Sequence, residues 1–185
     1  MENVENPLGN IYISYRAIAS IAHKAALETY GVVGLTAKNL AAGLAQAIVK
    51  DGEGATKFVT LEIVNGPDES STKSVAHAIA TSPLCKTAFY GADPNWGRII
   101  AAAGRSGVPI NPDALDLWLI AADGTSVQLL AAGQPTDFDE PAAIALMKAH
   151  AFTFRLDLHM GSSTVTVWTC DLSHEYVSIN ADYRT

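Results

Sequence analysis

The sequence predicts an α+β fold, in which layered mixed sheets pack with helices. Some stretches place apolar residues at helical spacing, others are dense in β-branched residues, and the two kinds are mixed throughout the chain. Some neighbouring strands are joined by a short turn, as in a hairpin, whereas others are followed by a helix. This mixture favours an α+β arrangement over a doubly wound parallel sheet.

The helices are predicted from apolar spacing, capping residues and breakers. They cover Tyr15–Tyr30, Lys38–Lys50, Glu69–Thr81, Asp93–Gly104 and Asp139–His150. The extended segments cover Asn10–Ser14, Lys57–Val64, Leu84–Tyr90, Leu115–Ala121, Ser126–Ala131, Phe152–Leu158 and Ser163–Thr169. In this interpretation Ser82-Pro83 ends a helix before an extended stretch, and Asp123-Gly124 forms a hairpin turn. The polar stretch Ser173–Thr185 favours neither type of structure.

Composition sets the broad class of the protein. The 185 residues are 49% hydrophobic, which is enough for a core without disulfide support. The net charge of −7 argues against a nucleic-acid partner, which would require a basic face. No run is long and apolar enough to cross a membrane, and the acidic, polar start is unlike a signal peptide. These features predict a cytoplasmic protein.

Cysteine and histidine give no sign of a metal site. Cys85 and Cys170 lack metal-ligand spacing and are expected to be core thiols. The five histidines are dispersed along the chain. We therefore expect neither a metal nor a cofactor.

Three long motifs carry more information than their composition. They are Ile48–Thr60, which contains Asp51-Gly52-Glu53-Gly54; Ala80–Ile99, which contains Asp93-Pro94-Asn95-Trp96-Gly97-Arg98; and Trp168–Thr185. Together and in this order they resemble the bifunctional ornithine acetyltransferase/N-acetylglutamate synthase family of arginine biosynthesis, the ArgJ family. The resemblance covers about residues 40–185 and implies the fold of the C-terminal half of that enzyme.

The resemblance implies a function and three substrate-binding residues. Members of the family cleave themselves before a threonine, which then carries the acetyl group from N-acetylornithine to glutamate. An oxyanion hole in the first chain assists that transfer. The family implies substrate binding by Glu53, Asn180 and Thr185. Nothing upstream of Asp51 resembles the cleavage motif, so no catalytic residue is expected within this chain.

The chemistry of these three residues fits an amino-acid ligand. The carboxylate of Glu53, in a glycine-flanked turn, could meet the ammonium end of an ornithine-like molecule. Asn180 offers an amide donor and acceptor, and Thr185 offers a hydroxyl and the α-carboxylate of the chain. The alternative is a plain solvated turn around Glu53. For Asp93–Arg98 a structural role is favoured, in which Asp93 caps a helix and Arg98 pairs with a carboxylate.

The first forty residues do not resemble the acetyltransferase. Residues 6–40, with Pro7–Ser14 and Tyr30–Leu35 as their main motifs, resemble the start of the alkaline-shock/envelope-stress family. This resemblance predicts a chimera, with a strand–helix–strand opening over residues 1–40 and an acetyltransferase-like domain over residues 41–185.

Two functional hypotheses follow. In the first, the chain is an ornithine acetyltransferase-like domain that is inactive alone because a separate chain must supply the threonine and the oxyanion hole. In the second, it is a non-catalytic fused or truncated α+β domain with a structural or amino-acid-binding role. The expected partners are ornithine, N-acetylornithine or glutamate and, because a half-domain exposes apolar edges, a second copy of the chain.

Overall fold

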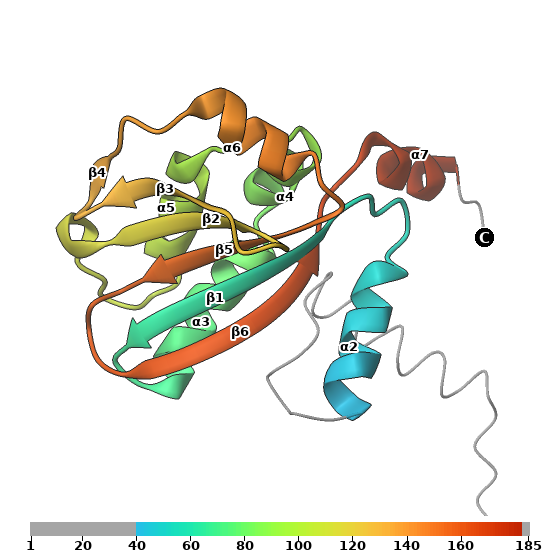
Figure 1. The fold of residues 1–185 in the computed structure, drawn as a ribbon. Coiled ribbons are helices and arrows are strands. Elements are labelled where there is room, and N and C mark those ends of the chain that lie inside the picture. The colour runs from blue at the N-terminus through green and yellow to red at the C-terminus, as the bar shows by residue number, and fades with distance from the viewer. Residues whose placement is uncertain (1–39, 183–185) are drawn as a thin grey trace, which may run out of the picture.

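A computed structural model describes residues 40–182 of the chain, which fold around one six-stranded mixed sheet (Figure 1). The predicted strand Asn10–Ser14, the helix Tyr15–Tyr30 and Thr185 lie outside the described residues. The fold class predicted from the sequence, α+β with a mixed sheet and helices, is confirmed.

Strands and helices are interspersed along the chain. They are β1 (Phe58–Gly66), β2 (Asp116–Ala121), β3 (Ser126–Ala131), β4 (Gln134–Pro135), β5 (Ala151–Asp157) and β6 (Ser163–Cys170). The helices are α2 (Leu40–Lys50), α3 (Glu69–Ala80), α4 (Pro83–Tyr90), α5 (Trp96–Gly104), the 3-10 turn η1 (Pro112–Ala114), α6 (Glu140–Met147) and α7 (His174–Asp182).

The sheet has the order β4-β3-β2-β5-β1-β6. β1 runs parallel to β5, and the remaining neighbours pair antiparallel. β2 and β3 form the hairpin that the sequence predicts at Asp123-Gly124, and Gly124 adopts a φ of +88° there. β5 and β6, although consecutive in the chain, lie on opposite sides of β1.

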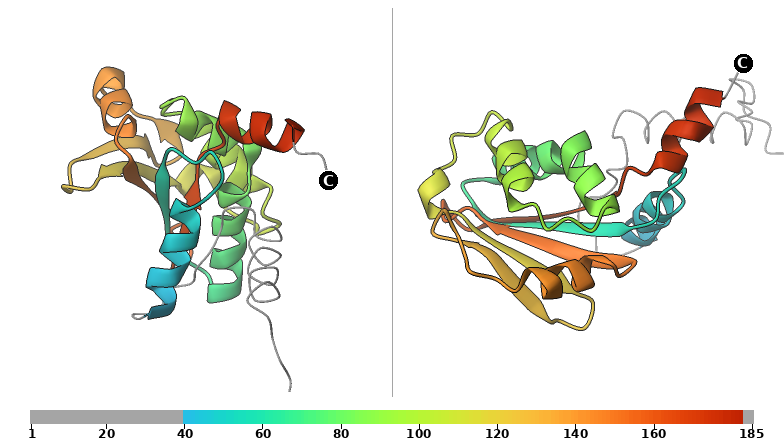
Figure 2. Two further views of the ribbon diagram at one scale, coloured as in Figure 1. Left: turned by 90° about the vertical axis from the view of Figure 1, so that its right-hand side faces the viewer. Right: turned by 90° about the horizontal axis from the view of Figure 1, so that it is seen from above.

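The alternation of buried and half-buried residues along β1 shows which face of the strand points into the core. Val59, Leu61 and Ile63 are buried, whereas the intervening residues are half-buried. Helices α3 and α5 lie on one face of the sheet (Figure 2), and the buried side chains of α3, such as Val75 and Ile79, join the same core as these strand residues. The core therefore fills the space between this helical layer and the sheet.

A triad of phenylalanines ties α4 into that core. The ring centroid of Phe89 lies 6.1 Å from that of Phe152 and 5.6 Å from that of Phe154, and the latter two rings are 5.9 Å apart. All three side chains are buried. The small ring separations fall in the range of favourable aromatic contacts.

The segment Leu84–Tyr90 is helical, so its prediction as an extended stretch was wrong. Ser82 and Pro83 begin helix α4 instead of only ending α3: the Ser82 hydroxyl accepts the Cys85 N–H, and Pro83 occupies the first turn. Proline lacks an N–H and has a fixed φ, and both properties suit the first turn of a helix. Only two residues, Thr81 and Ser82, therefore separate α3 from α4.

Two smaller details differ from the predictions. The cap of α5 is Asn95, whose side chain accepts the Arg98 N–H, whereas Asp93 was predicted. The Arg98 guanidinium donates to the Leu84 carbonyl at 2.9 Å and the Thr87 hydroxyl at 3.3 Å, and not to a carboxylate of the described residues. Arg98 thus links α5 to α4, which supports the structural role predicted for the Asp93–Arg98 motif.

Helix α2 packs on the other side of the sheet from α3 (Figures 1 and 2). Its Ala45 and Val49 meet Trp168 and Cys170 at the end of β6. Both cysteines are buried free thiols, as predicted. No helix within residues 40–182 is long and apolar enough to span a membrane.

Candidate functional site

The turn after α2 carries the first predicted site residue. Asp51–Gly54 leave the helix in a tight turn in which Gly54 has a φ of +66°, and the Glu53 side chain is exposed there. Glycine is favoured at such a backbone conformation. Glu53 therefore projects into solvent at the start of β1, in the glycine-flanked turn that the sequence predicts.

The second predicted residue meets the first. Asn180 lies in α7, a helix that forms in the stretch for which the sequence favoured no structure. Its Nδ2 donates to Glu53 Oε2 at 3.0 Å and to the Tyr176 carbonyl at 2.8 Å. The structure thus brings together two predicted site residues that are 127 positions apart.

The pair leaves acceptor oxygens available. Both protons of the Asn180 amide are used in the two bonds above. Glu53 Oε1 and Asn180 Oδ1 accept no hydrogen bond from the described residues. A carboxylate and an amide oxygen together favour a primary ammonium, which carries three donors. The arrangement can therefore bind the amine of an amino acid, whereas an isolated carboxylate ligand would be repelled by Glu53.

The polar residues near this pair include Thr56, His174 and Glu175. The Thr56 hydroxyl donates to Asp171 Oδ2 at 2.6 Å. His174 and Glu175 are exposed, and the His174 ring stands edge-on to Tyr90 with centroids 5.7 Å apart. Within residues 40–182 there is no cluster of three or more histidines, cysteines or acidic residues suited to a metal.

Sequence reasoning missed the residues that fix the turn. Asp171 and Ser173 bond to residues 54–57 from the segment between β6 and α7. Both residues lie within the third sequence motif, Trp168–Thr185, so the family resemblance already pointed to this segment. Their partners lie more than a hundred positions away, and local pattern does not reveal such pairing.

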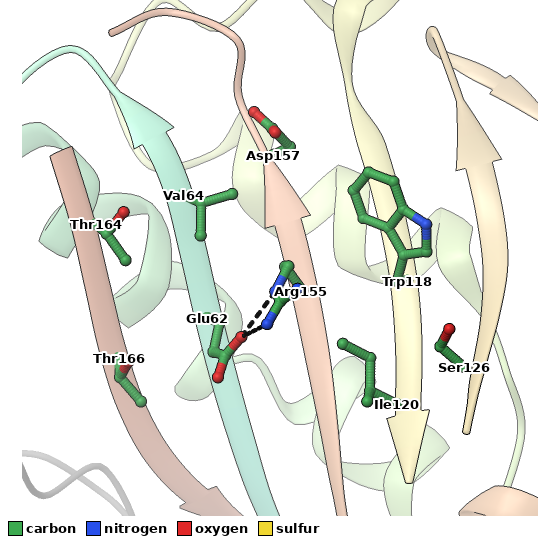
Figure 3. A pocket seen from close by; sticks show the side chains of 9 residues that line it. All are labelled: Glu62, Val64, Trp118, Ile120, Ser126, Arg155, Asp157, Thr164 and Thr166. Carbon is green, nitrogen blue, oxygen red and sulfur yellow. Dashed lines mark hydrogen bonds and ion pairs between the residues drawn. The ribbon is translucent and has the colours of Figure 1, made fainter. Parts of the chain in front are cut away.

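A second polar surface lies on the sheet face away from α3, and Figure 3 shows the side chains that line it. At its centre Glu62 Oε2 receives bonds of 2.8 Å from both Nε and Nη2 of Arg155. That pairing neutralises the guanidinium. The lining residues are Glu62, Val64, Trp118, Ile120, Ser126, Arg155, Asp157, Thr164 and Thr166, and they include neither Glu53 nor Asn180.

Comparison with known proteins decides the family. A model of the ArgJ family matches residues 17–185 of the chain. The chain belongs to the ArgJ family. The match begins within the segment 6–40, whose resemblance to the alkaline-shock family stays a prediction.

The relatives of this ArgJ-family chain come from bacteria and fungi. The "Arginine biosynthesis bifunctional protein ArgJ" of Thermotoga neapolitana is 46% identical over 142 residues, covering 77% of this chain and 36% of that protein. The mitochondrial ArgJ protein of Schizosaccharomyces pombe is 46% identical over 148 residues, covering 80% of this chain and 33% of that protein. The chain therefore spans about a third of the length of these curated relatives.

A solved structure supports the same assignment. The crystal structure of the arginine biosynthesis bifunctional protein argJ from Bacillus halodurans superposes with a TM-score of 0.72 at 35% identity. The superposition covers 94% of this chain and 75% of that one. The fold and the sequence motifs thus point to one family.

Proposed function

We propose that this chain forms the amino-acid-binding part of an ornithine/glutamate N-acetyltransferase of arginine biosynthesis. The observation that carries the proposal is the hydrogen bond of 3.0 Å between Asn180 and Glu53. Two residues that the family resemblance assigns to substrate binding come from the turn between α2 and β1 and from the last described helix.

In this proposal Glu53 binds the ammonium group of ornithine or N-acetylornithine. Its free Oε1 and the free Oδ1 of Asn180 accept from that ammonium, while Asn180 Nδ2 keeps Glu53 oriented. The Thr185 hydroxyl, five positions beyond Asn180, is proposed as a third contact. Because Glu53 and Asn180 are exposed, a ligand can reach them without displacing core side chains.

We also propose that the chain does not transfer acetyl groups by itself. In the family chemistry a threonine hydroxyl attacks the acetyl carbonyl of N-acetylornithine and releases ornithine, and the amine of glutamate then takes the acetyl group. In this proposal the residues upstream of Asp51 do not provide the cleavage motif that generates this threonine. A segment equivalent to the remaining two-thirds of the relatives would supply the nucleophile and the oxyanion hole.

An acetyl-transfer assay tests this proposal. The chain is incubated with N-acetylornithine and glutamate, alone and with the part of the Thermotoga neapolitana relative that this chain does not cover, about two-thirds of that protein, added as a separate polypeptide. We expect transfer only in the second case, and we expect Glu53→Gln to abolish it. Acetyl transfer by the isolated chain would overturn the proposal that it needs a second segment for activity. Ornithine binding without any transfer would favour a non-catalytic amino-acid-binding domain.

Three further features belong to the proposal. We place the boundary between the two parts of the chain at about residue 40, within the predicted helix Lys38–Lys50.

We propose a cytoplasmic location, which the two free thiols fit, although fungal relatives are named mitochondrial. Self-association of the chain through its open sheet is proposed as well, and sedimentation of the purified chain would measure it.

A further inference from the structure

The Asp171 carboxylate holds the start of β1. Asp171 directly follows β6 and is only 3% exposed. Its Oδ1 accepts the N–H groups of Thr56 and Lys57, each at 2.8 Å, and its Oδ2 accepts the Thr56 hydroxyl at 2.6 Å. A buried carboxylate with three donors is well satisfied, and hydrogen bonds to a charged acceptor are stronger than neutral ones.

Ser173 connects the same turn to α7. Its hydroxyl donates to the Gly54 carbonyl at 2.6 Å and accepts the Tyr176 N–H at 3.2 Å. The turn and the helix approach so closely that a Cβ on Gly54 would lie 2.7 Å from the Tyr176 nitrogen. One hydroxyl thus joins the residue after Glu53 to the first turn of the helix that carries Asn180.

The segment that makes these bonds is itself fixed to α4. The Leu172 N–H donates to the Lys86 carbonyl at 3.1 Å. The Lys86 ammonium, in a residue only 2% exposed, donates to the Thr169 hydroxyl at 3.3 Å and contacts the Cys170 sulfur at 3.4 Å. Asp171 and Ser173 therefore project from a segment that the core already holds.

We propose that Asp171 and Ser173 are positioning residues that hold Glu53 opposite Asn180 for ligand binding. We call these two residues and their partners Gly54, Thr56 and Lys57 the clasp. The inference rests on the proposed binding role of Glu53. A hydrogen bond between two exposed side chains contributes no more than the entropy cost of ordering a single residue. The buried bonds of the clasp must therefore order the turn and the helix before the exposed pair can form.

Ligand affinity in the full chain tests the clasp. Calorimetric titration with ornithine and with N-acetylornithine would compare the unmodified chain with Asp171→Asn, which keeps the shape of the side chain but replaces one acceptor oxygen by a donor. We expect about tenfold weaker binding, the effect of losing one charge-assisted hydrogen bond. Asp68→Asn is the matched control, because Asp68 also accepts a backbone N–H, from Ser71 at 2.8 Å, but does so beyond the far end of β1.

A double-mutant cycle separates positioning from general destabilisation. If Asp171 acts through Glu53, Asp171→Asn should weaken binding little further in a Glu53→Gln background. A full additional tenfold loss in that background, or unchanged affinity in the single Asp171→Asn variant, would overturn the inference.

Amide hydrogen exchange provides a readout that needs no ligand. Asp171→Asn and Ser173→Ala should each speed exchange in residues 51–57 and in residues 174–182, while the β2–β3 hairpin stays protected. Unchanged exchange in α7 would overturn the clasp. If neither amino acid binds the unmodified chain, the proposed function fails, and the exchange result still decides whether the clasp orders the turn and α7.

Discussion

The two ends of strand β1 are tied to their surroundings by similar bonds made with different donors. At the start, Asp171 accepts only main-chain and hydroxyl donors. At the far end, Asp157 accepts the Asn65 amide at 2.7 Å and the His159 N–H at 2.9 Å. The His159 ring, whose side chain is 44% exposed, bonds to Asp116 Oδ2 at 2.7 Å.

The difference lies in what can titrate. The donors to Asp171 are two main-chain N–H groups and a threonine hydroxyl, and none of these donors carries a titratable charge. At the far end the imidazole of His159 changes its charge near neutrality. The bonds at the start of β1 therefore do not depend on the charge of a donor, whereas the contacts at the far end include a histidine whose charge changes with pH.

The largest expected effect comes from Gly54→Ala. The substitution forces alanine into a φ of +66° and brings its Cβ against the backbone of Tyr176. We expect a loss of about 3 kcal/mol in unfolding free energy, measured by urea denaturation. Gly124→Ala is the control: Gly124 has a φ of +88° but no neighbour within 4 Å of an added Cβ, so it should cost only about 1 kcal/mol. Equal losses in the two variants would contradict the close packing of the turn on α7.

Ser173→Ala should have the next largest effect. It removes the bonds to Gly54 and Tyr176 in a residue that is 4% exposed, so we expect a loss of about 1 to 2 kcal/mol by the same measurement. Ser71→Ala, beyond the far end of β1, removes an exposed hydroxyl bond to Asp68 and should cost under about 0.5 kcal/mol. A larger loss of stability in Ser71→Ala than in Ser173→Ala would show that the bonds at the start of β1 contribute less to stability than those beyond its far end.

The pH dependence of stability should reside at the far end. The hydrogen bond to Asp116, with a smaller contribution from the charge of Asp157, raises the pKa of His159 above its ordinary value despite some desolvation. The stabilisation is complete below the unfolded pKa of about 6.5 and is lost as the pH rises through the higher folded pKa. Because the side chain is exposed, solvent screening keeps the effect below about 1 kcal/mol.

The measurement is a comparison of His159→Gln with the unmodified chain in thermal melts between about pH 5.5 and about pH 9. The unmodified chain should be the more stable at the acidic end, and the difference should vanish at the alkaline end. A constant difference across this range would show that the His159–Asp116 bond contributes no proton-linked stability.

The smallest effect on stability is expected for Glu53→Ala. The side chain is exposed, and its bond to Asn180 is solvated, so the unfolding free energy should change by less than about 0.5 kcal/mol. A cooperative melt lost in this variant would make Glu53 a structural residue and would contradict the assignment of its side chain to ligand binding.

Much of the fold followed from local pattern in the sequence. The β2–β3 hairpin, the Asp139 cap of α6 and the strand after the Asp51–Gly54 turn were predicted because each depends on neighbours in sequence. Leu84–Tyr90 was mispredicted because Ser82-Pro83 both ends one helix and begins another, and the sequence was interpreted only as an ending. Where α7 packs depends on Ser173 and Gly54, a contact between distant positions.

The candidate site was predictable only in part for the same reason. The family resemblance supplied Glu53 and Asn180, and the structure supplied their hydrogen bond. Asp171 was not predicted because an acidic residue after a strand has no local feature that distinguishes a solvated side chain from a buried acceptor. Its role depends on Thr56 and Lys57, which are 115 and 114 positions away.

If Glu53 and Asn180 form an amino-acid-binding pair, a ligand should stabilise the folded chain through them. The measurement is a thermal melt of the purified chain with N-acetylornithine, ornithine and glutamate, repeated with Glu53→Ala and with residues 180–185 removed. We expect a cooperative transition that at least one of these ligands raises in the unmodified chain, by an amount that grows with ligand concentration, and in neither variant. A cooperative transition that is indifferent to all three ligands would contradict it.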